Sequence, residues 1–95
     1  MKINAEYRCY KITGAKPLDK NESMTLSFLE SGKLLYTHKF DEGEHVRAYF
    51  YDISDGKVNV YENLISKPCN VFLYDGKTVI SVLGGVEIHF KKTGE

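Results

Sequence analysis

Hydrophobic and polar positions alternate along most of the chain, in short runs that end at Gly, Asp, Asn or Pro. Runs of this kind, rich in Val, Ile, Tyr and Phe, are typical of strands with one buried face. The first run covers residues 2–13, one long loop follows over 14–22, and about eight runs occur in all. The pattern predicts an all-β, mainly antiparallel fold of consecutive hairpins, with at most one short helix near residues 63–68. We expect a small β-barrel or a two-layer β-sandwich.

The clearest hairpin lies around Asp55-Gly56, a dipeptide suited to the two-residue type I′ loop. In that register Phe50 is opposite Tyr61, and Tyr51 shares a face with Ile53. We expect the face of Tyr51 to lie in the core. Phe50 and Tyr61 then form an aromatic pair on the other face.

Two further hairpins are predicted around Asp75-Gly76 and Gly84-Gly85. The first places Phe72 opposite Val79 and Leu73 opposite Thr78, and the second places Val79 opposite Phe90 and Leu83 opposite Val86. The strand that they share, Thr78 to Leu83, is apolar on both faces, with Val79 and Leu83 on one and Ile80 and Val82 on the other. Both faces of this strand therefore need cover, from the chain itself or from a second subunit.

Residues 20–31 admit two interpretations. Asp19 and Glu22 resemble a capping box, which predicts a helix. The alternation in the second half of the segment predicts instead a strand, which a Ser-Gly turn would pair with the next run so that Phe28 lies opposite Leu35. We favour the strand because the next run otherwise lacks a near partner.

Composition adds limits on size, charge and location. A chain of 95 residues with 42% hydrophobic residues fits one domain over residues 1–95. The 13 basic and 13 acidic residues balance, so no overall field attracts a nucleic acid or an anionic membrane. The first ten residues carry charges and no apolar run, which argues against a signal peptide or membrane anchor. We expect a cytoplasmic protein with no membrane partner, and the charge balance weighs against nucleic acid.

Residues that could carry catalysis or bind metal are few. None of the three histidines, His38, His45 and His89, lies near a nucleophile motif. Cys9 and Cys69 stand alone, without the second pair that a zinc site needs. The acidic segment between His38 and His45 matches no metal-loop spacing. We therefore expect no catalytic residues, no metal site and no cofactor, and a protein that is not an enzyme.

Aromatic residues are the remaining functional signal, with seven Tyr and five Phe but no Trp. Tyrosine joins apolar area to a polar tip, which suits interfaces. The first hypothesis is a non-enzymatic β module that binds another protein or associates with itself as a homo-oligomer. An accessory or inhibitory protein of a phage or mobile element would fit this hypothesis. The residues expected to make these contacts are Tyr49, Phe50, Tyr51, Tyr61, Tyr74, Ile80 and Val82.

Two alternatives stand beside this hypothesis. A closed barrel of this size could hold a small, nucleotide-like molecule at its mouth or at a subunit junction. An OB-like binder of single-stranded nucleic acid would stack bases on Phe50, Tyr61 and Tyr74. In that second alternative the phosphates would meet Lys57, Lys77, Lys91 and Lys92.

Overall fold

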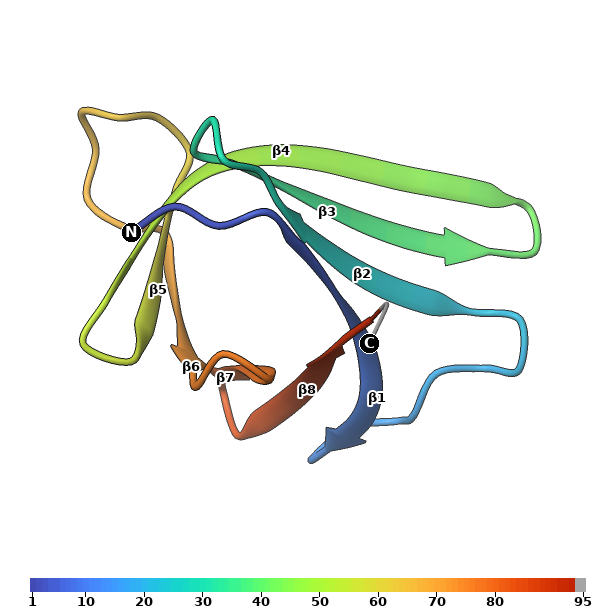
Figure 1. Ribbon diagram of the computed structural model, residues 1–95. Coiled ribbons are helices and arrows are strands. Elements are labelled where there is room, and N and C mark those ends of the chain that lie inside the picture. Colours follow the sequence, from blue (N-terminus) through green and yellow to red (C-terminus); the bar gives the residue numbers. More distant parts are fainter. Residues whose placement is uncertain (94–95) are drawn as a thin grey trace.

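The computed structural model describes residues 1–93 and forms a closed barrel of eight antiparallel strands (Figure 1). Each strand pairs with the next along the chain, and β8 closes the barrel on β1. The described residues contain no helix, and thus none that could cross a membrane. The barrel is therefore the architecture, and the sandwich is not. The strands are β1 (Ala5–Thr13), β2 (Ser23–Phe28), β3 (Lys33–Phe40), β4 (Gly43–Ser54), β5 (Lys57–Tyr61), β6 (Asn70–Tyr74), β7 (Thr78–Leu83) and β8 (Val86–Lys92).

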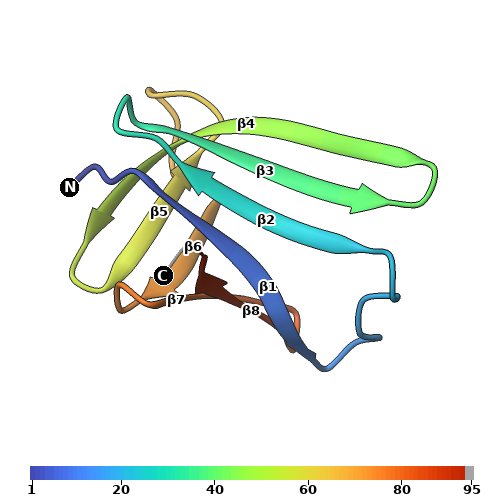
Figure 2. The same ribbon diagram turned by 45° about the vertical axis from the view of Figure 1, so that its right-hand side comes forward.

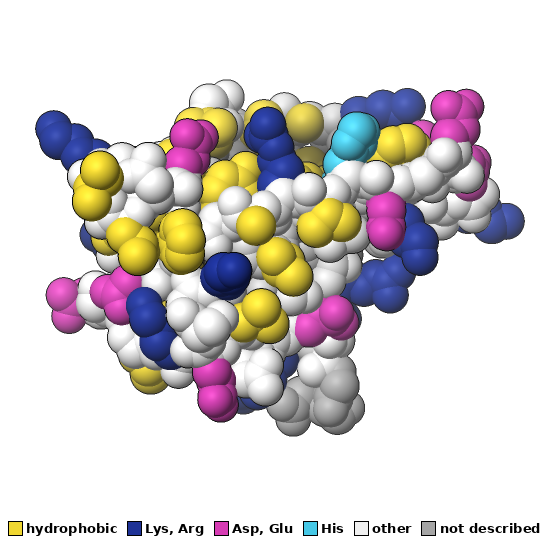
Figure 3. Space-filling model, turned by 90° about the horizontal axis from the view of Figure 1, so that it is seen from above, with side chains coloured by type: hydrophobic (Ala, Val, Ile, Leu, Met, Phe, Trp, Pro, Cys, Tyr) yellow, Lys and Arg dark blue, Asp and Glu magenta, His cyan; other side chains and the backbone are white. Residues whose placement is uncertain are grey.

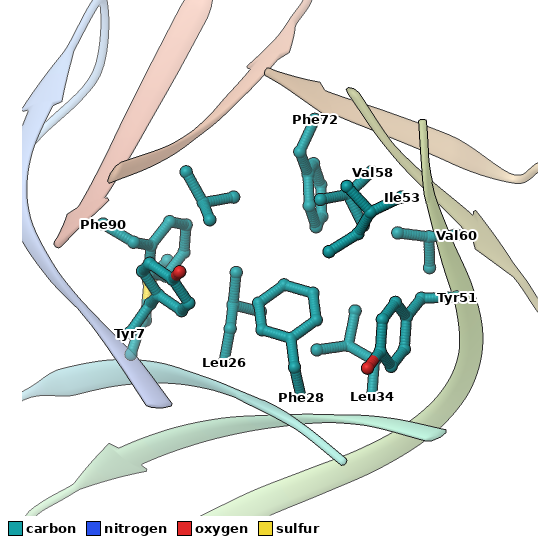
Figure 4. Close-up of a cluster of buried hydrophobic side chains, with 12 residues drawn as sticks. Tyr7, Leu26, Phe28, Leu34, Tyr51, Ile53, Val58, Val60, Phe72 and Phe90 are labelled. Carbon is teal, nitrogen blue, oxygen red and sulfur yellow. The ribbon is translucent and has the colours of Figure 1, made fainter. Parts of the chain in front are cut away.

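The core lies inside the barrel and is built from alternate residues of all eight strands. Phe28 stands at its centre, between Tyr7 and Tyr51 (Figure 4). Both tyrosine rings meet the Phe28 ring edge-on, with centroids 5.5 Å and 5.0 Å away. Such edge-to-face contacts stabilise an aromatic cluster beyond the burial of its area. The other buried side chains are Met24, Leu26, Leu34, Ile53, Val58, Val60, Phe72, Val79 and Phe90.

One end of the barrel is filled and covered by the N-terminal segment. The Tyr51 hydroxyl accepts a hydrogen bond from the Ile3 N–H at 2.8 Å and donates one to the Leu29 carbonyl oxygen at 2.8 Å. The Lys2 ammonium donates to the Tyr51 carbonyl oxygen at 2.8 Å. Figure 2 shows this segment at the same end as the turns that join β2 to β3 and β4 to β5. We call this the closed end of the barrel.

Two of the predicted hairpins have the predicted register. Phe50 is opposite Tyr61 and Ile53 is opposite Val58, and the loop between them has Asp55 and Gly56 at φ 52° and 72°. Positive φ at both positions is what a type I′ loop requires. At Gly84-Gly85, all the predicted pairs from Leu83–Val86 to Val79–Phe90 are present.

The strand at residues 23–28 is confirmed, but its predicted register was wrong by one residue. Phe28 lies opposite Leu34, not Leu35, because the turn has three residues rather than two. Gly32 N–H donates to the Leu29 carbonyl oxygen at 3.0 Å, and Leu29 N–H donates to that of Lys33 at 2.9 Å. A one-residue slip exchanges the two faces of a strand. It places Leu34 in the core, where it is 1% exposed.

The register of the Asp75-Gly76 hairpin was wrong by two residues. Phe72 lies opposite Ser81, and Leu73 opposite Ile80. The Asp75 Oδ1 atom accepts hydrogen bonds from the N–H groups of Lys77 and Thr78, at 2.9 Å and 2.8 Å. These bonds place Asp75 before the turn rather than inside it. Because the shift is even, every residue keeps its predicted face.

The helix interpretation of residues 20–31 was wrong, although one of the two capping-box bonds exists. Asp19 N–H donates to Glu22 Oε1 at 3.0 Å, and Glu22 N–H donates to the Asp19 carbonyl oxygen at 3.1 Å. Both bonds close a turn, and β2 follows it directly. The candidate helix near residues 63–68 is also a turn, in which Ser66 N–H donates to the Asn63 carbonyl oxygen.

Candidate functional site

The end of the barrel opposite the closed end is open and holds a pocket of about 300 Å³. Its buried part is apolar, and its less buried part carries hydroxyl, amide, thiol and carboxyl groups. A volume of this size lies at the lower limit for small-molecule sites. The apolar lining is Met24, Leu26, Leu34, Val60, Phe72, Ile88 and Phe90. The polar lining is Tyr36, Tyr49, Glu62, Cys69, Asn70 and Ser81.

The space exists because the inward positions change size along the barrel. Ser81 is the inward residue of β7 at this level, and its neighbours across the strands are Phe72 and Ile88. Its small side chain leaves unfilled the volume that Val79 fills two residues earlier on the same face. The pocket thus follows from the inward residues of the strands, which are large and apolar deep in the barrel and small or polar at the rim.

The described residues contain no buried charged side chain, so the deeper part of the pocket is electrically neutral. Burial raises the pKa of Tyr36, and nearby Cys9 and Tyr49 raise it further. The Tyr36 hydroxyl is therefore protonated at neutral pH and is able both to donate and to accept a hydrogen bond. The pocket lining contains no lysine or arginine. This environment favours an apolar molecule over one that carries a phosphate.

Strands β3 and β4 extend beyond the barrel beside the mouth and form an arm, which Figures 1 and 2 show projecting on the right. On the face of the arm that continues the barrel interior, His38 lies opposite His45, with the Phe40 ring 5.7 Å and 5.5 Å from theirs. Arg47 lies opposite Tyr36 and forms no ion pair with another residue of the 1–93 range. The arm thus places one unpaired guanidinium next to the pocket.

The loop between β1 and β2 is fastened to the base of this arm. His38 Nε2 lies 2.6 Å from Glu22 Oε2. The Asp19 N–H and then His38 lower the pKa of Glu22, so its carboxyl group is ionised at neutral pH. A second hollow lies beside this pair and shares Met24 and Ile88 with the mouth pocket. The loop therefore forms a wall of the same open end.

The seven predicted contact residues do not form one surface. Tyr51 is 1% exposed in the core, as its face predicted, and it therefore has no place in a surface that meets a partner. Tyr49 lines the mouth pocket, and Tyr74 lies near the closed end with its ring 6.3 Å from that of Tyr7. The other four point outward, as the pair Phe50–Tyr61 on β4 and β5 and as Ile80 and Val82 on β7.

The outer face of β7 carries apolar side chains without cover from the barrel. Leu73 lies opposite Ile80, and Val71 and Val82 extend this pair into an apolar row. Leu73, Val71 and Val82 are each close to half exposed, and Ile80 is better covered. Of the two strand faces that needed cover, the fold therefore covers the one with Val79. Leu83, expected beside Val79, is exposed because it lies at the end of the strand.

Sequence reasoning missed the residues that form the mouth. Tyr36, Asn70 and Ser81 are the less buried inward positions of β3, β6 and β7, and Glu62 follows directly after the end of β5. The alternation of inward and outward residues, continued from each core residue toward the open end, would have identified them. Its use required knowledge of which strand ends meet at the same end of the barrel.

The arrangement expected for base stacking is absent. Phe50 and Tyr61 lie outside the barrel, whereas Tyr74 contacts core residues from the inside. Eight strands in sequential order also differ from the five-stranded Greek-key OB fold. Across the face seen in Figure 3, basic, acidic and hydrophobic side chains are interspersed rather than gathered into a basic stripe.

Sequential pairing and closure define the class: an up-and-down antiparallel β-barrel with one filled end and one open end. Within residues 1–93, no group of three or more His, Cys, Asp and Glu side chains is arranged to hold a metal ion. Comparison of the chain with protein-family models, with curated proteins and with solved structures finds no match.

Proposed function

We propose that this protein binds a compact, mostly apolar small molecule in the mouth pocket. The observation that carries the proposal is the asymmetry of the barrel. The closed end is filled by Tyr7, Phe28 and Tyr51, whereas the open end keeps about 300 Å³ of space above Leu26 and Phe90. An eight-stranded barrel is just wide enough to hold one small ligand.

The lining sets the chemistry of the molecule. Apolar side chains favour a hydrocarbon or aromatic body, because removal of apolar surface from water favours binding. Tyr36, Asn70 and Ser81 offer hydrogen bonds to one or two polar groups near the mouth. Glu62 at the rim and Arg47 on the arm offer a counter-charge to a headgroup of either sign.

A fluorescence titration with 1-anilinonaphthalene-8-sulfonate tests the proposal, with octanol, octanoate and octylamine as competitors. We expect saturable binding of the dye at one site per barrel and displacement by at least one competitor. The competitor that displaces best reports the headgroup that the rim prefers.

Two variants of one strand show where the dye binds. Ser81→Phe fills the pocket from β7 and should weaken dye binding by at least about tenfold, because a bulky ring takes the ligand's place. Val82→Phe adds a ring to the adjacent position on the outer face and is the matched control. Equal dye binding by both variants would place the dye outside the barrel and count against the proposal.

A further inference from the structure

Strand β4 is longer than the neighbour that should cover it. It pairs with β3 from Gly43 to Phe50, but with β5 only from Phe50 onward. Within the described range no strand pairs with the other edge of residues 43–49. Figure 1 shows this edge as the upper border of the arm. The barrel is closed, yet its arm keeps an open strand edge.

The hydrogen-bonding groups on that edge can be assigned. Tyr51 N–H donates to the Gly32 carbonyl oxygen at 3.0 Å, on the β3 side. Because successive residues of a strand point their N–H and C=O groups to opposite sides, Glu44, Val46 and Ala48 point theirs to the open edge. Three N–H groups and three carbonyl groups are therefore presented in a row.

The backbone of this edge is not blocked. Natural proteins protect open edges with proline, bulges, a covering segment or charged side chains, and this edge has only the charges of Glu44 and Arg47. Residues 43–49 contain no proline, their pairing with β3 is regular, and residues 43–48 are all exposed. Such an edge is a ready template for another strand.

We propose that this edge pairs with the same edge of a second copy of the chain, antiparallel about a two-fold axis at Val46. In this register Val46 lies opposite Val46 of the second copy, and Glu44 lies opposite Ala48. Each copy donates three backbone hydrogen bonds to the other, and the two arms become one continuous sheet. The inference is independent of the proposed ligand site.

The side chains on the edge fit a second copy in this register and not in its neighbours. Val46, which is 55% exposed, gains an apolar partner at the axis. Arg47 lies opposite His45, so no two carboxylates and no two guanidinium groups lie opposite each other. Of the two neighbouring registers, one places Val46 opposite the charged Glu44, and the other places Arg47 opposite Arg47, where like charges destabilise a cross-strand pair.

The oligomeric state over a range of concentrations tests the proposal, by light scattering after size exclusion. We expect a mass that rises toward twice 10.8 kDa as concentration increases. Val46→Glu opposes two carboxylates at the axis and should keep the chain monomeric. Val46→Thr keeps the β-branched shape and should still dimerise.

Leu73→Lys, on the outer face of β6, is a control for association through the apolar row. It should dimerise like the original chain. Loss of the dimer in Leu73→Lys but not in Val46→Glu would place the interface on that row and overturn the proposal. Unchanged dye binding by Val46→Glu would show that the ligand site does not depend on the dimer.

Amide hydrogen exchange measures directly whether the N–H groups of this edge are hydrogen-bonded. The N–H groups of His45, Arg47 and Tyr49 face β3 and should be protected at every concentration. Those of Glu44, Val46 and Ala48 should become protected only as the dimer forms. A monomer at millimolar concentration, or protection of these three amides at monomeric mass, would overturn the pairing of two copies.

Discussion

At the scale of single residues, Tyr51 joins three parts of the closed end. Its ring packs on Phe28, and its hydroxyl bonds to Ile3 in the N-terminal segment and to Leu29 in the β2–β3 turn. Burial raises the pKa of Tyr51, so the hydroxyl keeps the proton that it donates. The residue therefore couples core packing to the cover over this end.

Tyr51→Phe should lower the free energy of unfolding by about 1–3 kcal/mol, because it leaves polar backbone groups without their partner. Urea unfolding followed by circular dichroism measures the change. Tyr10→Phe is the control, because Tyr10 is 51% exposed and its loss should stay within about 0.5 kcal/mol. Equal losses for the two variants would contradict the assigned role of Tyr51.

Gly14, at the start of the β1–β2 loop, is held against the β7–β8 turn. It has φ +81°, and a Cβ atom added there would lie 2.2 Å from the Gly85 carbonyl oxygen. The position thus needs glycine for its conformation and for the close approach of two backbones.

Gly14→Ala should be more destabilising than Gly76→Ala, which has φ +94° but open space around the new methyl group. Both variants bear a conformational cost of about 1–3 kcal/mol, and Gly14→Ala adds a clash with backbone. Thermal unfolding gives the comparison. A melting temperature for Gly14→Ala at or above that of Gly76→Ala would refute the close contact.

At the scale of elements, the β6–β7 hairpin depends on the Asp75 carboxylate. The N–H groups of Thr78 and then Lys77 hold the pKa of Asp75 below its ordinary value of 3.8. A carboxyl group whose pKa is lowered by folding stabilises the folded chain when the pH is above the ordinary pKa of that group. That contribution is lost as the pH falls through the lowered pKa.

Asp75→Asn should therefore be less stable than the original chain at pH 7, and the difference should shrink as the pH falls below about 4. Unfolding measured at several pH values between 2 and 7 tests this. Asp41→Asn, at the exposed tip of the arm, is the control and should follow the original chain throughout. A difference for Asp75→Asn that is constant with pH would contradict the argument.

The hairpins also show how far the sequence predicts the fold. Asp55-Gly56 and Gly84-Gly85 supply the positive φ angles of a two-residue loop, so local chemistry alone determined both registers. At Asp75 and near Gly32 the register depends on which group fills a particular hydrogen bond. Alternation does not encode that choice, and so the pattern predicted the strands but not these two pairings.

At the scale of the whole molecule, function follows from which strand ends meet. Tyr49 was predicted as a contact residue from its type, but it lines the pocket only because β4 passes the open end. The pocket and the open edge of residues 43–49 both arise from barrel closure and from unequal strand lengths. Neither property is local in sequence. The sequence therefore indicated a ligand at the barrel mouth only as a general alternative, and it could not identify the residues of either candidate site.

The proposed function depends above all on entry of a ligand into the barrel at its open end. The most direct measurement is the set of nuclear Overhauser effects between 1-anilinonaphthalene-8-sulfonate and the methyl groups of the protein. We predict contacts to the inward methyl groups of Leu26, Leu34, Val60 and Ile88. Contacts confined to the outward methyl groups of Val71, Leu73, Ile80 and Val82 would contradict the account.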